Sequence, residues 1–235
     1  MIESFVALDL ETTGVNSSTD RIIEIGLQCV INGEVVREYN QLVNPGRKLE
    51  PRITELTGIS DEMLVGKPGI EQIIPEVIEM IGDLPLLGHN IIFDYGFLKK
   101  AALTSGFTFD KKGIDTLKIA RVLLPQLEKK NLSVLCDYFD IDTGNSHRAL
   151  DDANSARLLY YKLHEIKPDY EAFDVPTQLV LNIKKEVPIT LPQKKYLNDL
   201  LKYHNITLDE DIEMMSKSRA SKVIDGIIST HGRIL

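Results

Sequence analysis

The chain has 235 residues, 43% of them hydrophobic, which is enough for one good-sized globular domain and a small additional unit. Its formal net charge is −8, the wrong sign for a protein that holds nucleic acid through a broad basic face, although a protein that handles phosphate through bound divalent cations is not excluded. The first residues carry acids and no apolar run approaches about 18 residues, so we expect no signal peptide, no membrane span and a cytoplasmic location.

The first part of the chain has the pattern of three β-strands. Residues 3–9 and 21–31 are apolar runs, and Asn32-Gly33 separates the second run from residues 34–43. An Asn-Gly pair between two such runs is the strongest short signal for a β-hairpin. We therefore predict a three-stranded meander.

The pattern then changes to helical spacing, interrupted by two short strands. Residues 70–81 predict a helix that Pro75 would shorten or kink. Further strands are predicted at 84–90 and 113–117, and further helices at 91–106, 131–139 and 147–166, the last with Ser146 available as its cap. Three strands, then helices alternating with two more strands, indicate an α/β fold with a mixed five-stranded sheet flanked by helices.

Composition divides the chain into three expected parts. Residues 1–167 would form the main domain. Residues 168–189 contain three prolines and mixed charge, which is typical of a linker. Thr190 to Gln193 has the pattern of a capping box with a proline in the first helical turn, so residues 190–235 are expected to form a small helical domain of unknown role.

Acidic residues supply a candidate metal site. Side chains alternate along a strand, so Asp9 and Glu11 would point the same way at its end, where they repel each other unless a cation lies between them. Such a pair alone is more simply interpreted as a strand that ends in a polar turn. Asp94, one turn into a helix, and Asp152, on the long helix five residues after His147, would complete an all-oxygen set that favours magnesium or manganese over zinc.

Three segments carry a family resemblance. LDLETTG, HNIIFDYGFL and HRALDDA, in this order, resemble the three motifs of the DEDD 3′–5′ exonucleases. The His-x4-Asp spacing of the third is similar to the His-containing, DnaQ-like branch, which includes the proofreading subunit of bacterial DNA polymerase III and ribonuclease T. The resemblance covers about residues 1–166 and implies a ribonuclease H-like fold.

The resemblance also implies roles for individual residues. Asp9, Glu11, Asp94 and Asp152 would hold two divalent cations, Mg²⁺ or Mn²⁺, and His147 would act as general base on the attacking water. The substrate would be contacted by Leu10, Thr12, Leu56, Thr57, Ile59, Asn90 and His147. The implied reaction removes nucleoside 5′-monophosphates from single-stranded or mispaired 3′ ends of DNA, in proofreading or repair.

Other functions stay open. Trimming of RNA from the 3′ end is the first alternative, because no residue reveals how a 2′-hydroxyl is met. A non-catalytic nucleic-acid-binding module on the same fold would be expected to have lost an acid or His147, and a phosphatase for small substrates would release phosphate. Residues 178–183 loosely resemble a sliding-clamp-binding peptide, a weak ground for a clamp or DNA polymerase as partner, and a short apolar segment packed on the main domain is favoured.

Overall fold

The structure is a computed structural model that describes residues 1–144, 147–181, 188–208 and 210–234. Contacts between Cα atoms divide the chain into two compact units. The larger consists mainly of Met1–Pro45 and Leu49–Asn182, and the smaller mainly of Ile183–Leu235. Each unit has a hydrophobic core of its own.

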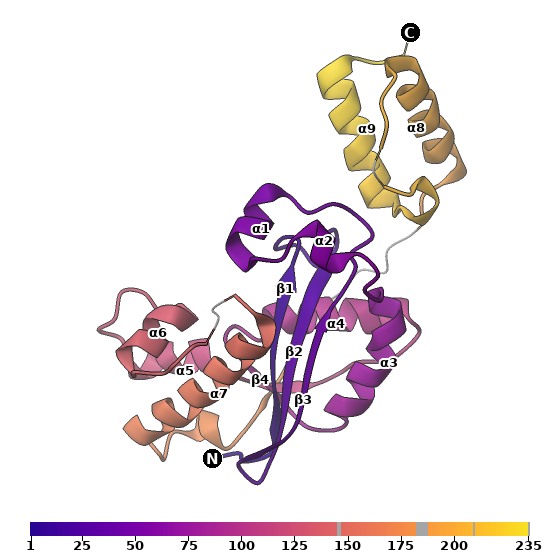
Figure 1. The fold of residues 1–235 in the computed structure, drawn as a ribbon. Coiled ribbons are helices and arrows are strands. Elements are labelled where there is room, and N and C mark those ends of the chain that lie inside the picture. Colours follow the sequence, from indigo (N-terminus) through magenta and orange to yellow (C-terminus); the bar gives the residue numbers. More distant parts are fainter. Residues whose placement is uncertain (145–146, 182–187, 209, 235) are drawn as a thin grey trace. The chain divides into compact units, whose positions relative to one another are not determined.

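A mixed β-sheet forms the centre of the larger unit (Figure 1). Its strands lie in the order β3-β2-β1-β4-β5-β6, and β1 pairs antiparallel with β2 and parallel with β4. The bounds are β1 Phe5–Thr12, β2 Ile22–Ile31, β3 Glu34–Leu42, β4 Leu86–Gly88, β5 Lys112–Asp115 and β6 Thr177–Gln178. The α/β class and the five expected strands are confirmed. The sheet has six strands because the two-residue β6 adds to its edge, in a segment whose composition indicates a linker.

The hairpin between β2 and β3 is formed as its sequence predicts. Asn32 and Gly33 both have positive φ values, 51° and 82°, which a two-residue turn of this kind requires at both positions. Ile31 pairs with Glu34 directly across the turn. The meander of β1, β2 and β3 is therefore confirmed.

Helices cover both faces of the sheet (Figure 1). They are α1 Pro51–Thr57, α2 Asp61–Leu64, α3 Ile70–Ile81, α4 Ile92–Thr104, α5 Thr116–Leu123, α6 Leu132–Tyr138 and α7 Ala149–Ile166. Apolar residues of α3 and α4 pack with Val6, Leu8 and Leu10 of β1, whereas those of α5, α6 and α7 pack with Phe5 and Ala7. The strand's alternation thus assigns its odd-numbered residues to the face that α7 covers.

Two helices differ from their sequence patterns in detail. Helix α3 has the predicted bounds and continues through Pro75, which lies on its exposed face, where a carbonyl freed of its partner can bond to water. Helix α7 starts at Ala149 instead of 147, because His147 has a φ of 63° and Arg148 is the extended N-cap residue. The expected cap, Ser146, lies outside the described residues.

The segment that follows α7 packs on the sheet as far as the structure describes it. A short 3₁₀ turn, Glu171–Phe173, places the fully buried Phe173 beside Tyr160 of α7, with 5.5 Å between the ring centroids. Leu179 is also buried, and its side chain occupies the space that a Cβ atom on Gly113 of β5 would need. Leu179 and Leu181 of the clamp-like stretch thus pack on the main domain, whereas Val180 is 71% exposed, and residues 182–187 are outside the described part.

The smaller unit consists of two helices joined by an extended return that contains the 3₁₀ turn Ile212–Met214. Helix α8 spans Leu191–His204 and α9 spans Lys217–His231. Thr190 and Gln193 form the predicted capping box at the start of α8. Gln193 also bonds to Lys217 and Ser221 of α9, so the two helices begin side by side. Their core is built from Leu197, Leu200, Met215, Ala220, Ile224 and Ile227.

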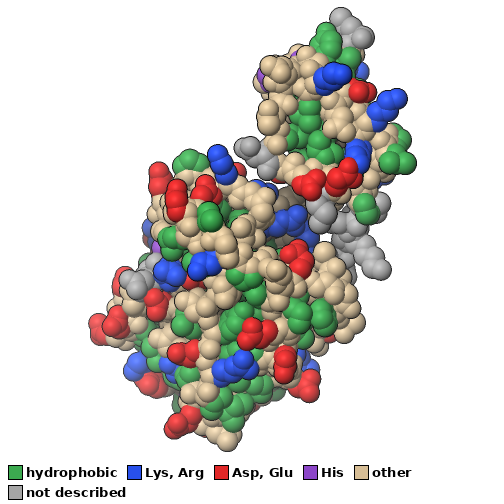
Figure 2. Space-filling model, turned by 45° about the vertical axis from the view of Figure 1, so that its right-hand side comes forward, with side chains coloured by type: hydrophobic (Ala, Val, Ile, Leu, Met, Phe, Trp, Pro, Cys, Tyr) green, Lys and Arg blue, Asp and Glu red, His purple; other side chains and the backbone are tan. Residues whose placement is uncertain are grey.

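Neither a membrane span nor a broad basic face is expected from the sequence. Within the described residues, every helix is too short or too polar to cross a bilayer. On the face of the molecule shown in Figure 2, acidic and basic side chains are interspersed, without a continuous basic stripe among the described residues. The mixed charge on this face agrees with the net charge of −8.

Candidate functional site

Strand β1 presents Asp9 and Glu11 on the face that α7 covers. In the antiparallel pairing with β2, Asp9 lies opposite Gly26 and Glu11 opposite Glu24. The register shifts just after Glu11, so regular pairing ends there. Both acids therefore stand at the end of a buried strand, on the same side, as the alternation of the sequence predicts.

Helix α4 brings Asp94 to the same end of the sheet. Strand β4 runs parallel to β1 and ends at Gly88, and the turn through Asn90, with a φ of 71°, leads directly into α4. Asp94 is only 3% exposed, and its Oδ1 accepts a 3.1 Å hydrogen bond from the backbone N–H of Leu10. Because Leu10 separates Asp9 from Glu11, this bond ties Asp94 directly to the acidic pair.

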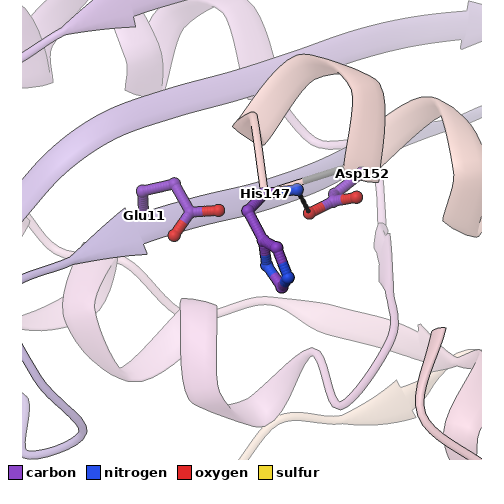
Figure 3. A group of neighbouring side chains, drawn as sticks. All are labelled: Glu11, His147 and Asp152. Carbon is purple, nitrogen blue, oxygen red and sulfur yellow. Dashed lines mark hydrogen bonds between the residues drawn. The ribbon is translucent and has the colours of Figure 1, made fainter. Parts of the chain in front are cut away.

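The start of α7 supplies the other two groups. His147 precedes the helix and Asp152 lies in its first turn; the backbone N–H of His147 donates a 3.0 Å hydrogen bond to Asp152 Oδ2. One ligand atom each from Glu11, His147 and Asp152 lies within 4.8 Å of the others. Figure 3 shows the imidazole ring of His147 between the two carboxylates. The structure therefore brings together residues from three distant parts of the chain.

Burial and the charges of neighbouring acids raise the pKa values of the four carboxyl groups. Burial is the first cause for all four, and it raises the pKa of Glu11 and of Asp94 to about 8. The pKa of Asp9 is raised well above its ordinary value by burial and then by the charges of Asp94 and Asp152, and burial likewise raises the pKa of Asp152. Such shifts mean that the four carboxylates are not stable together as anions unless positive charge joins them.

The donor set fits a hard divalent cation. Among the described residues, Glu11, His147 and Asp152 form the group whose ligand atoms lie close enough together to hold an ion. Asp9 and Asp94 add carboxylates beside this group. Carboxylate oxygens are the ligands that magnesium, manganese and calcium prefer, and His147 adds a single nitrogen. A cation would replace the protons that the raised pKa values otherwise hold on these acids. The acidic cluster is thus a candidate metal site.

Two residues of the site were missed by sequence reasoning. Glu24 of β2 is fully buried and forms a two-bond ion pair with Arg148, with Arg148 Nη2 2.6 Å from Glu24 Oε1. A signal existed for Glu24, since it is the only charged residue between Ile22 and Ile31. Its partner could not be identified, because nothing in the local sequence shows that Arg148 lies above that strand.

The residues expected beside the substrate differ in their surroundings. Thr12 is 9% exposed and its Oγ1 donates a 2.7 Å hydrogen bond to the carbonyl of Gly14, in the turn after β1. The side chain of Leu10 is buried in the core, and only its backbone faces the site through the bond to Asp94. Asn90 is exposed, and its backbone N–H donates to Asp115, which also caps α5.

Of the three residues expected to contact the substrate at the end of α1 and just beyond it, one is exposed. Leu56 is 55% exposed, whereas Thr57 and Ile59 are buried. The Thr57 hydroxyl donates to the carbonyl of Ile53 and accepts from the N–H of Ile59, so it holds the turn at the end of α1. Ile59 packs with Ile23, Leu49, Ile53 and Leu64 beneath α1 and α2.

Comparison with known proteins agrees with this geometry. A protein-family model described as Exonuclease matches residues 6–160. The DNA polymerase III subunit epsilon of Aquifex aeolicus is 36% identical over 163 residues, which are 69% of this chain and 81% of that protein. PolC-type DNA polymerases III from Clostridium perfringens and Caldanaerobacter subterraneus are 37% and 31% identical, over 74% and 95% of this chain.

Solved structures show the same fold. A structure of exonuclease X in complex with 5′-overhanging duplex DNA has 27% sequence identity and a TM-score of 0.56, and the match covers 71% of this chain and 94% of that one. A structure of exonuclease I has a TM-score of 0.63 at 19% identity and covers 74% of this chain and 43% of that chain. The second likeness supports the expected ribonuclease H-like fold alone.

The relatives differ greatly in length. The matched segment makes up 12% of the PolC-type polymerase of Clostridium perfringens and 17% of that of Caldanaerobacter subterraneus, so this chain corresponds to a small part of those proteins. The family model, in contrast, spans most of the larger unit. The chain therefore belongs to the exonuclease family, and its larger unit contains a DnaQ-like exonuclease domain.

Proposed function

We propose that this protein is a metal-dependent exonuclease that releases nucleoside 5′-monophosphates from the 3′ ends of DNA, single-stranded or mispaired. The observation that carries the proposal is the meeting of four carboxylates and one imidazole, from β1, α4 and the start of α7, at one end of the sheet. Catalysis is assigned to residues 1–167, and residues 190–235 form a separate helical domain.

Asp9, Glu11, Asp94 and Asp152 would hold two divalent cations, Mg²⁺ or Mn²⁺. When bound, such cations lower the pKa of a water molecule and offset charge on the departing 3′ oxygen. The raised pKa values of the acids support this assignment, because each carboxylate gains its full charge only when a cation is near. The bond from Leu10 holds Asp94 in place for this role.

His147 would take the proton from the attacking water. Its side chain is exposed beside Glu11 and Asp152, so water can reach the imidazole (Figure 3). The unperturbed pKa of histidine lies close to neutral pH, where a general base works best. The bond to Asp152 is made by the backbone of His147 and does not engage the imidazole ring.

The 3′-terminal nucleotide would lie against Thr12, the backbone of Leu10, Asn90 and Leu56. Leu56 is the exposed member of its segment, and Thr57 and Ile59 would act by holding its turn. DNA is favoured as substrate because the relatives include DNA polymerase III subunits and an exonuclease solved with duplex DNA. The same similarity supports a role in replication or repair and, more weakly, association with a polymerase or sliding clamp.

One gel experiment tests the proposal. Matched 5′-labelled single-stranded DNA, duplex DNA, duplex DNA with a mispaired 3′ end and RNA are each incubated with magnesium, manganese or chelator. The proposal predicts stepwise shortening of the DNA in either metal and none in chelator. Faster shortening of RNA would favour RNA trimming instead. No shortening of any of these substrates in either metal would contradict the proposal. A mobility shift would then identify a non-catalytic nucleic-acid-binding module, and phosphate release from an added small phosphate ester a phosphatase.

A further inference from the structure

The ion pair between Glu24 and Arg148 joins β2 to the start of α7. Glu24 is fully buried, and the side chain of Arg148 is 33% exposed. Arg148 Nε lies 3.0 Å from Glu24 Oε2, and Nη2 lies 2.6 Å from Oε1, so the guanidinium grips both oxygens. The backbone N–H of Ala149 also donates a 3.2 Å bond to Oε2.

A glycine lets α7 approach the strand at this point. A Cβ atom on Gly26 would collide with the backbone of Ala149 and Leu150, so the first turn of α7 lies directly on β2. Gly26 pairs with Asp9 across the sheet, and Glu24 pairs with Glu11. The contact and the ion pair therefore sit on the strand positions that face the two acids of β1.

The ion pair between Glu24 and Arg148 also sets the positions of His147 and Asp152. Arg148 directly follows His147, and its carbonyl accepts the helical bond from the N–H of Asp152. Holding Arg148 against Glu24 thus fixes both His147 and Asp152 relative to β1 and β2. Both Glu24 oxygens accept hydrogen bonds from Arg148 or Ala149, so the Glu24 carboxylate binds the start of α7.

We propose that Glu24 and Arg148 are positioning residues that hold the His147–Asp152 half of the site at its working distance from the Asp9–Glu11 half. The inference rests on the proposed function. Arg148 has a second effect, because its charge balances a buried carboxylate that lies directly beside Glu11. Residues that orient ligands in this way typically change metal affinity or activity by about 10–100-fold when they are removed.

The test removes both partners together. Removing Arg148 alone would leave an unpaired buried charge, which destabilises folds strongly, so the variant is Glu24→Gln with Arg148→Met. The matched control is Arg157→Met, on the same helix. Arg157 also links α7 to β2, through a 2.9 Å bond from Nε to Gln28 Oε1, but it lies five residues beyond Asp152 and ten beyond His147. Melting temperatures in chelator establish that the double variant is as well folded as the control.

Two readouts separate positioning from general stability. The first is Mn²⁺ affinity, measured by electron paramagnetic resonance, and the second is kcat and KM on a single-stranded oligonucleotide. We expect Mn²⁺ binding to weaken and kcat to fall by roughly 10–100-fold in the double variant, with KM within about threefold and the control close to the parent. Mn²⁺ affinity and kcat of the double variant within twofold of the control would overturn the proposal.

The Mn²⁺ measurement also separates this inference from the proposed function. If the parent binds Mn²⁺ but shortens no oligonucleotide, the proposed function is wrong and the affinity difference still decides the role of the pair. If the parent binds no Mn²⁺, both are overturned. Partial recovery of Mn²⁺ affinity and kcat by Arg148→Lys would support positioning by the guanidinium, because lysine restores the positive charge without the hydrogen bonds to both Glu24 oxygens.

Discussion

The backbone N–H of His147 donates a hydrogen bond to the carboxylate of Asp152, five residues further along the chain. The bond couples an exposed residue with positive φ to the first turn of α7, so the backbone of His147 is held beside the carboxylate of Asp152. Because it involves the backbone of His147, it survives replacement of the ring. The ring can therefore be tested without disturbing Asp152.

Replacement of His147 by alanine should lower exonuclease turnover by roughly 10²–10⁴-fold and leave the fold intact, because the ring is exposed and would act as the general base. The measurement is kcat on a single-stranded oligonucleotide at saturating magnesium, with circular dichroism as a check of folding. His231→Ala, in α9 of the smaller unit, is the control and should retain the parent's rate. Parent-like turnover of His147→Ala would exclude His147 as the base.

Asp9→Asn should abolish metal-dependent activity and at the same time stabilise the metal-free protein. The raised pKa of Asp9 means that this buried acid must hold a proton that the unfolded chain releases at pH 8, and asparagine removes that cost; a difference of one pKa unit corresponds to about 1.4 kcal/mol. Urea unfolding in chelator at pH 8 measures the gain, and the same titration with magnesium should show that the variant has lost the stabilisation that the metal gives the parent. Activity retained at saturating magnesium would contradict the role of Asp9.

Stability of the metal-free protein should fall as the pH rises from about 5 to about 8. The folded state raises the pKa of Glu11 from 4.5 to about 8, so between these values it holds a proton that the unfolded chain releases. This contribution is present in full below the unfolded pKa and is lost as the pH passes through the folded value. Asp94, also with a pKa of about 8, acts in the same direction.

Melting temperature in chelator, followed over this pH range, measures the effect. Glu11→Gln should flatten the curve, and magnesium should reverse its slope, because cation binding replaces protons and strengthens as they leave. A melting temperature in chelator that rises steadily from pH 5 to pH 8 would show that the acids do not repel one another in the folded state.

Gly26→Ala should destabilise the larger unit by about 1–3 kcal/mol and lower activity, because the added methyl group forces the first turn of α7 away from β2. Gly226→Ala makes a useful contrast. Gly226 lies within α9 with open space around it, so the same substitution should stabilise that helix by about 1 kcal/mol. Urea unfolding followed by circular dichroism compares the two. Equal effects in both positions would contradict the close packing of α7 on Gly26.

Much of the fold could be predicted from local pattern. The alternation around Asp9 and Glu11, the Asn32-Gly33 turn and the bounds of α3 follow from period and turn chemistry, and the structure confirms them. Helix α1 had a signal that went unused, with Pro51 at its first position and Gly58 just beyond its end. The two-residue β6 had none, because its place depends on β5, more than 60 residues away.

The candidate site was predictable only in part. The four acids and His147 belong to short motifs whose order along the chain is informative. Glu24 and Arg148 are 124 residues apart, and their contact depends on the register of β2 against β1 and on where α7 crosses the strand. Likewise, the burial of Thr57 and Ile59 depends on how α1 and α2 fold over Ile23. Such three-dimensional relationships leave no local trace in a single sequence.

The most direct test of the account identifies the products released from an unlabelled single-stranded DNA oligonucleotide in magnesium. Mass spectrometry should find nucleoside 5′-monophosphates as the only small products, and a 5′-labelled copy of the same oligonucleotide should shorten one nucleotide at a time. Asp9→Asn should release none. Release of nucleoside 3′-monophosphates or inorganic phosphate, or the same products in the presence of chelator, would contradict a metal-dependent exonuclease that works from the 3′ end.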